Sequence, residues 1–228
     1  MLKFLTGTGL SIALAVFVIG LLTRFVLYFL GLDWRLERIA YKPDMAHGLK
    51  GGLWSVLKWM IPMGTRGWKA QPLVSVATFL MHLGVVFVPL FLLGHNAILE
   101  QTVGISLPSL PRGLSHVLTI LGIAGAGYML YRRLTLPYVR ILTTRQDYLL
   151  IGLACFLLVT GFLAAVGFAG YGFWLFLHVL AGDILLIIAP FTKLSHIVLF
   201  FASRIQIGMD FAIKRGGHER EGGALFPW

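Results

Sequence analysis

Five long apolar runs dominate the chain, and short segments richer in polar and basic residues separate most of them. The runs cover roughly residues 8–31, 73–98, 114–131, 147–169 and 173–202. About 20 predominantly apolar residues cross the hydrocarbon core of a bilayer as an α-helix. The pattern therefore predicts an all-α membrane protein, in which residues 1–228 form one domain with five transmembrane helices and a tail from 203 to 228.

The composition supports a multi-pass membrane protein with the lipid bilayer as its surroundings. The chain is 58% hydrophobic and only 12% charged, whereas a soluble domain carries about a quarter charged residues. The formal net charge of +10 then fits loops on the cytoplasmic side of a membrane better than a nucleic-acid partner. The basic residues show no interleaving with aromatic residues of the kind that favours nucleic acid.

The basic residues also predict the orientation. Segment 32–70 contains seven lysines and arginines, segment 132–146 contains four, and the chain from residue 203 contains four more. The other side has only Lys3 and Arg112. The positive-inside rule places the richer segments in the cytoplasm. We therefore expect the amino terminus outside, the carboxyl terminus inside, and a location in the cytoplasmic (inner) membrane.

Histidines are the candidate chemistry of the spans. His47 and His218 lie in polar segments and are expected to be solvated, whereas five others lie in or at the edge of apolar runs. Ionisable side chains are costly inside a bilayer and by default indicate a functional site. These five are His82, His95, His116, His178 and His196.

Spacing predicts two histidine pairs. His178 and His196 are 18 residues apart, which on one continuous helix is five turns, one face and about 27 Å of axis. The second helix runs the other way, so His95 can face His178 near the outer surface and His82 can face His196 near the inner one. Two opposed imidazoles are what a bis-histidine haem iron requires, and neutral imidazole suits iron. The expectation is two haem b groups stacked along the membrane normal.

The position of His95 is the weak point of this pairing. Thirteen residues separate His82 from His95, so on an ideal helix their directions differ by roughly 220°. A kink or local rewinding at Pro89 can bring them onto one arc. Otherwise His116, at the outer start of the third helix, is the reserve ligand.

Other cofactor sites fit the sequence less well. Zinc needs four ligands that converge on one site, but the histidines lie at two depths and no HExxH motif occurs. The single cysteine, Cys155, cannot hold an iron–sulfur cluster, so any such clusters belong to partners. The glycines of GIAGAGY lie inside a predicted span, where close helix packing explains them better than nucleotide binding.

The remaining polar groups of the spans suggest supporting roles. Lys193 and Arg132 are candidates for contacts with haem propionates, although lipid headgroups explain the arginine equally well. His116 and Asp183 are candidates for a quinone site, because quinol oxidation requires a proton acceptor. Asp183 is alternatively a proton relay or a hydrogen-bond partner of a ligand histidine.

Several stretches resemble the nitrate reductase gamma-subunit family of membrane cytochromes b. The resemblance implies a five-helix protein with two haem b groups that passes electrons between quinol and redox partners, with His82, His178 and His196 at ligand positions. The long first inner loop and the wide interval between the second-helix histidines make the chain more similar to cytochrome b subunits of Dsr-, Tmc- and Hmc-type complexes of sulfur metabolism. The first similarity is carried by LHVLAGDILLIIAPFTKLSHIVLF, MLYRRLTLPYVRILTTRQDYLLIGL and FLMHLGVV, and the second by PLFLLGHN and the long loop with WMIPMGTRGW.

This resemblance implies a cytoplasmic iron–sulfur partner like the catalytic subunit of heterodisulfide reductase, and a quinone or menaquinone substrate. A periplasmic multihaem cytochrome c and further membrane subunits are additional expected partners. A nitrate reductase gamma subunit is the alternative within this class, and a haem-free membrane anchor or ion or proton transporter is the alternative outside it.

Two peripheral segments allow further readings. WSVLKWMIPMGTRGW mixes tryptophans with basic residues, so it predicts either an amphipathic helix at the membrane interface or a docking surface for a partner. The polar, glycine-rich tail MDFAIKRGGHEREGGALFPW is expected to order against a cytoplasmic partner.

Overall fold

The structure is a computed structural model that describes residues 1–32 and 45–214, with the side chains of residues 213 and 214 left out. The described residues form helices and no strand. Part of the basic first loop, His218 and residues 215–228 of the tail lie outside the described residues. The expected docking of that tail therefore stays a prediction.

Among the described residues, five helical stretches are long and apolar enough to cross a membrane, as the sequence predicts. They are Leu2–Leu30, Pro72–Phe91, Arg112–Thr135, Arg145–Ala165 and Tyr171–Phe191. The first stretch consists of α1 (Leu2–Phe4), a π-helical turn (Leu5–Gly9) and α2 (Leu10–Leu30), and the second of α5 (Pro72–His82), another π-helical turn (Leu83–Phe87) and α6 (Val88–Phe91). The third and fourth are the single helices α8 (Arg112–Thr135) and α10 (Arg145–Ala165). The fifth is α11 (Tyr171–Ile188) followed by a 3₁₀ turn (Ala189–Phe191).

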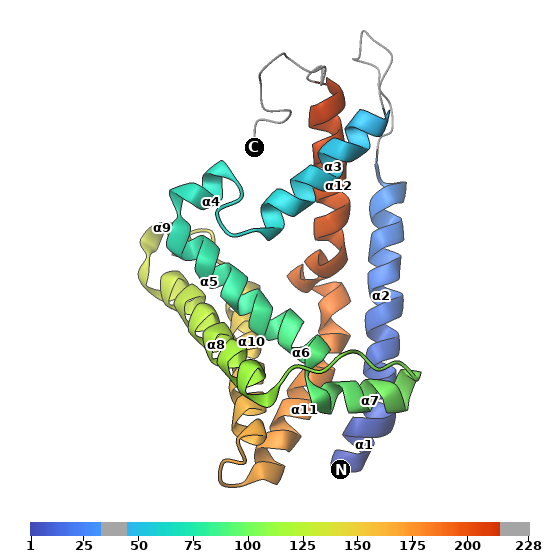
Figure 1. Ribbon diagram of the computed structural model, residues 1–228, viewed down its shortest axis with the longest axis vertical. Helices are drawn as coiled ribbons and strands as arrows, with labels where there is room; N and C mark the ends of the chain where they lie inside the picture. Colours follow the sequence, from blue (N-terminus) through green and yellow to red (C-terminus); the bar gives the residue numbers. More distant parts are fainter. Residues whose placement is uncertain (33–44, 215–228) are drawn as a thin grey trace.

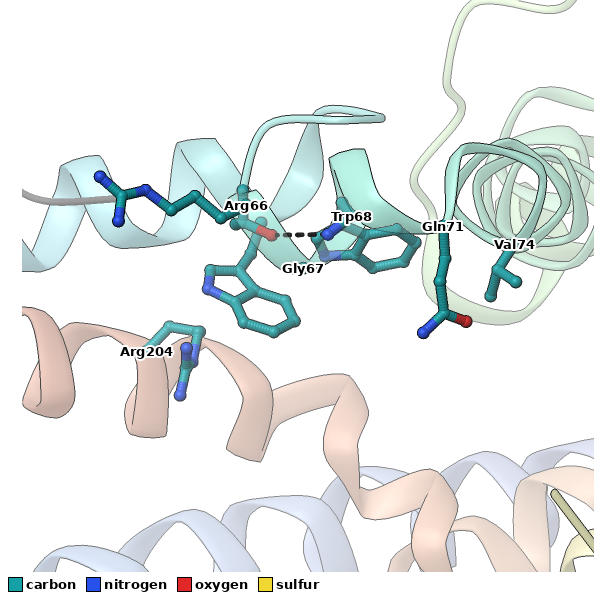
Figure 2. A pocket seen from close by; sticks show the side chains of 8 residues that line it. Arg66, Gly67, Trp68, Gln71, Val74 and Arg204 are labelled. Atoms are coloured by element: carbon teal, nitrogen blue, oxygen red, sulfur yellow. Dashed lines mark hydrogen bonds between the residues drawn. The ribbon is translucent and has the colours of Figure 1, made fainter. Parts of the chain in front are cut away.

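Shorter helices and one long helix complete the fold (Figure 1). Helix α3 crosses α12 near one end of the molecule, and α7 lies crosswise at the other end. The Thr65 hydroxyl accepts a hydrogen bond from the Trp68 N–H at 3.2 Å and caps the start of α4 (Figure 2). These helices are α3 (Met45–Met60), α4 (Arg66–Ala70), α7 (Leu93–Val103), α9 (Pro137–Arg140) and α12 (His196–Lys214).

Small residues fill the contacts between helices, and large apolar side chains face outward. Ile19, Leu22 and Leu149 are 66%, 59% and 73% exposed, whereas the buried apolar side chains include many alanines. Lipid tails are as apolar as leucine, so outward-facing leucine costs nothing there and small residues let helix backbones approach. This distribution suits a protein surrounded by lipid.

The glycines of GIAGAGY bring α8 close to α5, which confirms their predicted role in helix packing. A Cβ added to Gly122 would lie 2.8 Å from the Cα of Gly84, and one added to Gly125 would lie 2.5 Å from the backbone oxygen of Ala77. Real Cβ atoms do not tolerate such distances, so side chains at these positions would push α8 away from the helix that carries His82.

The predicted fifth helix, 173–202, is wrong as a single helix. Helix α11 ends at Ile188, two 3₁₀ turns follow, and α12 begins at His196. Pro190 has no backbone N–H and its ring clashes with the preceding turn of an α-helix, and Thr192 adopts an extended conformation at φ −122° and ψ −175°. The chain therefore leaves the α-helix at this point and re-enters it at His196.

The first helix supports this break. Pro190 is buried, and a Cβ on Gly20 would lie 2.6 Å from its ring. The Nε of Arg24 donates a hydrogen bond of 2.8 Å to the Pro190 carbonyl oxygen. Carbonyls at the end of a helix lack intrahelical partners, so Arg24 satisfies an acceptor that the break exposes within the apolar region.

The predicted second helix, 73–98, is also interrupted. It ends at Phe91, and Leu92 is extended with φ −85° and ψ 130° before α7 starts in a new direction. The π-helical turn Leu83–Phe87 directly precedes the helix that contains Pro89. Such turns accommodate an extra residue in a helix and are frequent at functional sites.

The basic segments that are described gather at one end of the molecule. Figure 1 shows α3, α4, α9 and the carboxyl end of α12 at the top, and the amino terminus and α7 at the bottom. The segments that the sequence assigns to the cytoplasm therefore share one end.

Candidate functional site

Two pairs of histidine rings face each other between helices. The rings of His82 in α5 and His196 at the start of α12 have centroids 6.1 Å apart, with an angle of 87° between their planes. The rings of His95 in α7 and His178 in α11 lie 5.8 Å apart at 16°. The structure thus brings together the same partners that the sequence pairs.

His95 reaches His178 through the change of helix direction at Leu92, and not through a kink at Pro89 alone. Helix α7 starts after Leu92, and the buried side chain of Asn96 ties it to the following loop. The Asn96 amide nitrogen donates to the Leu107 carbonyl oxygen at 3.0 Å and to the Ser109 hydroxyl at 3.1 Å. These bonds hold the helix turn that carries His95.

His196 reaches His82 because the chain breaks between α11 and α12. The sequence predicts that His178 and His196 share one face of a continuous helix. This prediction is wrong, because residues 189–195 form two 3₁₀ turns with an extended residue between them. His196 is the first residue of α12. The pair His82–His196 nevertheless forms.

All four histidines bond a backbone carbonyl oxygen through Nδ1. The distances are 2.7 Å from His82 to Thr78, 3.1 Å from His95 to Pro89, 3.1 Å from His178 to Leu157 and 2.9 Å from His196 to Lys193. A carbonyl oxygen only accepts, so Nδ1 carries the hydrogen and Nε2 keeps its lone pair. This arrangement fixes the tautomer and the ring direction that metal-ligating histidines require.

The ring of His178 packs against Gly161 and Thr160 of α10. A Cβ added to Gly161 would lie 2.7 Å from the His178 Cε1 atom, so only glycine leaves room for this ring position. The buried Thr160 hydroxyl lies 3.4 Å from Nδ1 and itself donates to the Phe156 carbonyl oxygen at 2.7 Å. Helix α10 therefore orients His178 although it contributes no histidine.

The two pairs fit the spacing of axial haem ligands. Two metal–nitrogen bonds of about 2 Å on opposite sides of one ion hold the centres of the two imidazoles roughly 6 Å apart. The observed centroid distances are 5.8 and 6.1 Å. The two ring distances are compatible with axial ligation, and the role of His82, His95, His178 and His196 toward haem iron stays a prediction.

The pairs lie at different depths along the bundle. The segment from His178 to Ile188 belongs to one helix, and its ten residue-to-residue steps rise about 15 Å; the turns at 189–195 follow before His196. His196 begins α12, which runs from there toward the end with α3, and His82 ends α5, which starts near α4, whereas His95 lies in α7 at the opposite end of the molecule (Figure 1). His196 is exposed, whereas the other three rings are partly buried.

His116 belongs to neither pair. Its ring contacts Phe162 of α10 at 5.7 Å with an angle of 77°. The structure therefore places His95, and not the reserve residue His116, opposite His178. His116 stands in the first turns of α8, close in sequence to the loop that Asn96 holds.

Asp183 does not hydrogen-bond any of the paired histidines. It is 6% exposed, and its Oδ2 has no hydrogen-bond partner among the described residues. It points toward the first helix, where a Cβ on Gly9 would lie 3.5 Å from Oδ2. The expected contact with a ligand histidine is not formed, whereas a proton-relay role stays a prediction.

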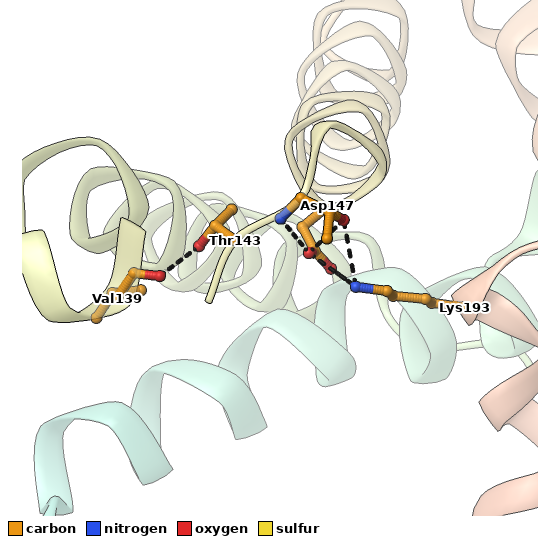
Figure 3. Close-up of polar contacts among 5 residues, drawn as sticks. Val139, Thr143, Asp147 and Lys193 are labelled. Carbon is orange, nitrogen blue, oxygen red and sulfur yellow. Dashed lines mark hydrogen bonds and ion pairs between the residues drawn. The ribbon is translucent and has the colours of Figure 1, made fainter. Parts of the chain in front are cut away.

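Lys193 has a carboxylate partner that the sequence analysis missed (Figure 3). Its Nζ lies 2.8 Å from both Asp147 oxygens and 3.3 Å from the Thr144 hydroxyl. Asp147 also accepts from the Thr144 N–H at 2.8 Å and closes a capping box at the start of α10. The charge of Lys193 is thus balanced within the protein, which weakens its predicted role toward a propionate.

Arg132 is buried at the end of α8 and donates to the Gln71 side-chain oxygen at 3.3 Å. Gln71 directly precedes the span that carries His82. The position of Arg132 at the Gln71 end of that span is compatible with the predicted propionate contact, which stays a prediction.

Comparison with known proteins places the chain in a family. It is 54% identical over 228 residues to a protein of Nitratidesulfovibrio vulgaris (strain Hildenborough), and the match covers all of both chains. The chain belongs to the family of this protein. The name of this relative, "Protein", states no activity. No family model and no solved structure matches the chain.

The match spans the positions of both histidine pairs in this chain, since it covers all 228 residues. Members of this family can therefore be tested side by side with the present chain, and the geometry of the two pairs says which positions to compare.

Proposed function

We propose that this chain is a di-haem membrane cytochrome b subunit that transfers electrons between the quinone pool and iron–sulfur or cytochrome partners. The observation that carries the proposal is the two cross-helix histidine pairs, each with both Nδ1 atoms bonded to backbone carbonyls. Ionisable side chains in or at the edge of membrane spans are costly, and by default they indicate a functional site.

In this proposal, four side chains hold two haem groups by their Nε2 atoms. His95 and His178 hold the outer one, and His82 and His196 hold the inner one. A haem supplies a one-electron carrier at the depth where its ligands lie. The carbonyls of Thr78, Leu157 and their counterparts would fix the tautomer and the direction of each imidazole, so that each Nε2 keeps a lone pair for the iron.

The proposed orientation puts the amino terminus outside and the carboxyl terminus in the cytoplasm. It is supported by the gathering of the basic segments at the end with α3, α4 and α9 (Figure 1), because cytoplasmic loops carry an excess of lysine and arginine. The pair His82–His196 then lies toward the cytoplasm and the pair His95–His178 toward the outside. Electrons would move along the membrane normal between them.

The proposed partners follow from the resemblance stated for the sequence. A heterodisulfide-reductase-like iron–sulfur subunit would exchange electrons at the cytoplasmic end, and a multihaem cytochrome c at the outer end, within a complex of sulfur metabolism in the cytoplasmic membrane. His116 is the candidate quinone-site residue near the outer pair. Its position at the start of α8, with a ring contact to Phe162, supports this assignment.

A redox difference spectrum of the purified full chain tests the proposal. We expect a b-type signal and two haem groups per chain. Changing His82→Ala should remove one haem and His178→Ala the other, whereas His218→Ala should keep both. Absence of a b-type signal from a folded preparation that was supplied with haem would end the proposal.

One observation favours a second candidate, a haem-free ion or proton transporter. Asp183 lies buried within a candidate span with an unpartnered Oδ2, and intramembrane carboxylates often mark proton pathways. Proton flux into vesicles that contain the haem-free chain, abolished by Asp183→Asn, would support this candidate.

A further inference from the structure

A cleft of about 420 Å³ opens at the end of the molecule that carries the basic segments. It lies between α3, α4, the start of α5 and α12 (Figure 2). None of the candidate haem ligands lines it. The polar and aromatic residues around it are Trp59, Thr65, Arg66, Trp68, Gln71 and Arg204.

The lining offers hydrogen-bond donors and positive charge. Two arginines belong to the lining: Arg204 lies beneath the tryptophans, whereas the exposed Arg66 side chain extends away from Trp68 and Gln71 (Figure 2). Among the described residues, the lining contains no carboxylate and no imidazole. The Arg204 guanidinium lies over the Trp59 ring, 4.8 Å from its centroid, and Trp59 meets Trp68 edge-on at 6.1 Å. Stacking on an aromatic face holds a guanidinium in place while its N–H groups stay available at the edge.

This donor set favours an anionic oxygen group over a quinone. Quinone chemistry requires a side chain that takes or gives protons, and arginine does not deprotonate in proteins. Phosphate and carboxylate oxygens, by contrast, accept several N–H bonds from arginine at once. The ligand class of the cleft is therefore an anion that keeps its charge.

The cleft lies where a membrane surface is expected. Gln71 directly precedes the span Pro72–Phe91, and tryptophans gather at membrane–water interfaces. Next to the cleft, an apolar shoulder on α3 and the turn after it is open to the surroundings. Its exposed side chains are Trp54 (43%), Leu57 (51%), Met60 (51%), Ile61 (54%) and Met63 (42%).

We propose that this cleft binds the headgroup phosphate of an anionic phospholipid. Arg66 and Arg204 contact the phosphate oxygens, Thr65 and Gln71 donate further hydrogen bonds, and the apolar shoulder covers acyl chain. Free phosphate uses only the donors, whereas a phospholipid uses the donors and the shoulder together. Basic pockets of this kind between membrane helices on the cytoplasmic side bind anionic headgroups. This site does not depend on the haem groups.

The test uses the full chain in nanodiscs that contain phosphatidylglycerol and phosphatidylcholine in equal amounts. Native mass spectrometry after transfer to detergent counts the lipids that stay bound. We expect retained phosphatidylglycerol in the unaltered chain, and a loss of about fivefold in retention for each of Arg66→Gln and Arg204→Gln. Arg204→Lys should retain part of the binding.

Lys69→Gln is the matched control, because Lys69 is an exposed cation of the same short helix that does not line the cleft. It should retain the lipid as well as the unaltered chain. Arg66 is exposed, so its replacement leaves the fold intact, and an unchanged melting temperature verifies this.

Three results would overturn the proposal. The first is equal retention in the arginine variants and the control. The second is full displacement of phosphatidylglycerol by inorganic phosphate at millimolar concentration, which would make the cleft a site for the free anion. The third is an unchanged lipid count with a shifted haem potential in Arg204→Gln, which would assign the cleft to a haem propionate.

Discussion

The ring of His95 lies 5.8 Å from the ring of His178, although the two residues belong to helices that run in different directions. Helix α11 carries His178 along the bundle, whereas α7 crosses its end. A short crosswise helix thus supplies one half of a pair whose other half comes from a spanning helix. The features that hold α7 and α10 in place are therefore as important for this pair as the histidines themselves.

Gly161→Ala should displace the ring of His178. The added Cβ would lie 2.7 Å from Cε1 and 3.0 Å from Nδ1, and overpacking of this kind costs about 1–3 kcal/mol. We expect loss or weakening of the outer haem signal with the inner one kept, measured by redox titration. Gly152→Ala on the same helix has nothing within 4 Å of its Cβ and should leave both signals unchanged. Equal spectra for the two variants would contradict the proposal that Gly161 leaves the space for the ring of His178.

Asn96→Ala should loosen α7. The buried amide loses its bonds to Leu107 and Ser109, which leaves acceptors unpaired at a cost of about 1–3 kcal/mol. The free energy of unfolding should fall, and hydrogen exchange in residues 93–103 should accelerate. Thr102→Ala, which removes an exposed hydroxyl that bonds only within the same helix, is the control. Protection of α7 that does not change in Asn96→Ala would refute the assigned role.

Asp147→Ala should cost more stability than Lys193→Met. Asp147 serves both the ion pair with Lys193 and the capping box at Thr144. The pair, in which the Lys193 side chain is about half exposed and that of Asp147 14% exposed, contributes about 1 kcal/mol, and loss of a cap costs about 1 kcal/mol. The ion-pair part should shrink in high salt because exposed charges are screened. Thermal unfolding of both variants and of the double variant measures the coupling, and a larger effect of Lys193→Met would contradict this account.

His116→Phe should abolish reduction of the haem groups by a quinol analogue while both haem groups stay bound. The imidazole is the proposed proton acceptor, and phenylalanine preserves the ring contact with Phe162 but takes no proton. Reduction by dithionite should remain normal. Loss of a haem from this variant would instead make His116 a ligand and overturn the pairing of His95 with His178.

The sequence predicts the five spans and the histidine partners, but not the route of the chain between them. Apolar periodicity reports that residues 173–202 are buried in lipid or protein, whereas it does not report that the helix stops at Ile188. Pro190 and Pro89 are the available signals, and each coincides with an interruption nearby. The ring of His196 lies beside that of His82, as the sequence predicts, although His178 and His196 do not share the continuous helix on which the prediction was based.

The contacts that the sequence could not predict join residues far apart. Lys193 and Asp147 are 46 residues apart, and Arg24 and the Pro190 carbonyl 166. The seat of His178 on Gly161 depends on how α10 and α11 pack, which no local pattern in either helix specifies. The residue types alone therefore identify the candidate histidines. The contacts that orient these histidines can be recognised only in the folded structure.

The first helix contains no histidine, yet it is fastened on both sides of the turn that leads into His196. Arg24 holds the Pro190 carbonyl just before this turn, and the Tyr28 hydroxyl donates to the Gln206 side chain beyond it. A deletion of residues 1–30 would thus release the segment that carries His196, and it would also remove a helix that packs against α11 beside Asp183. The amino-terminal helix therefore holds the chain on both sides of His196, although it supplies no candidate ligand of its own.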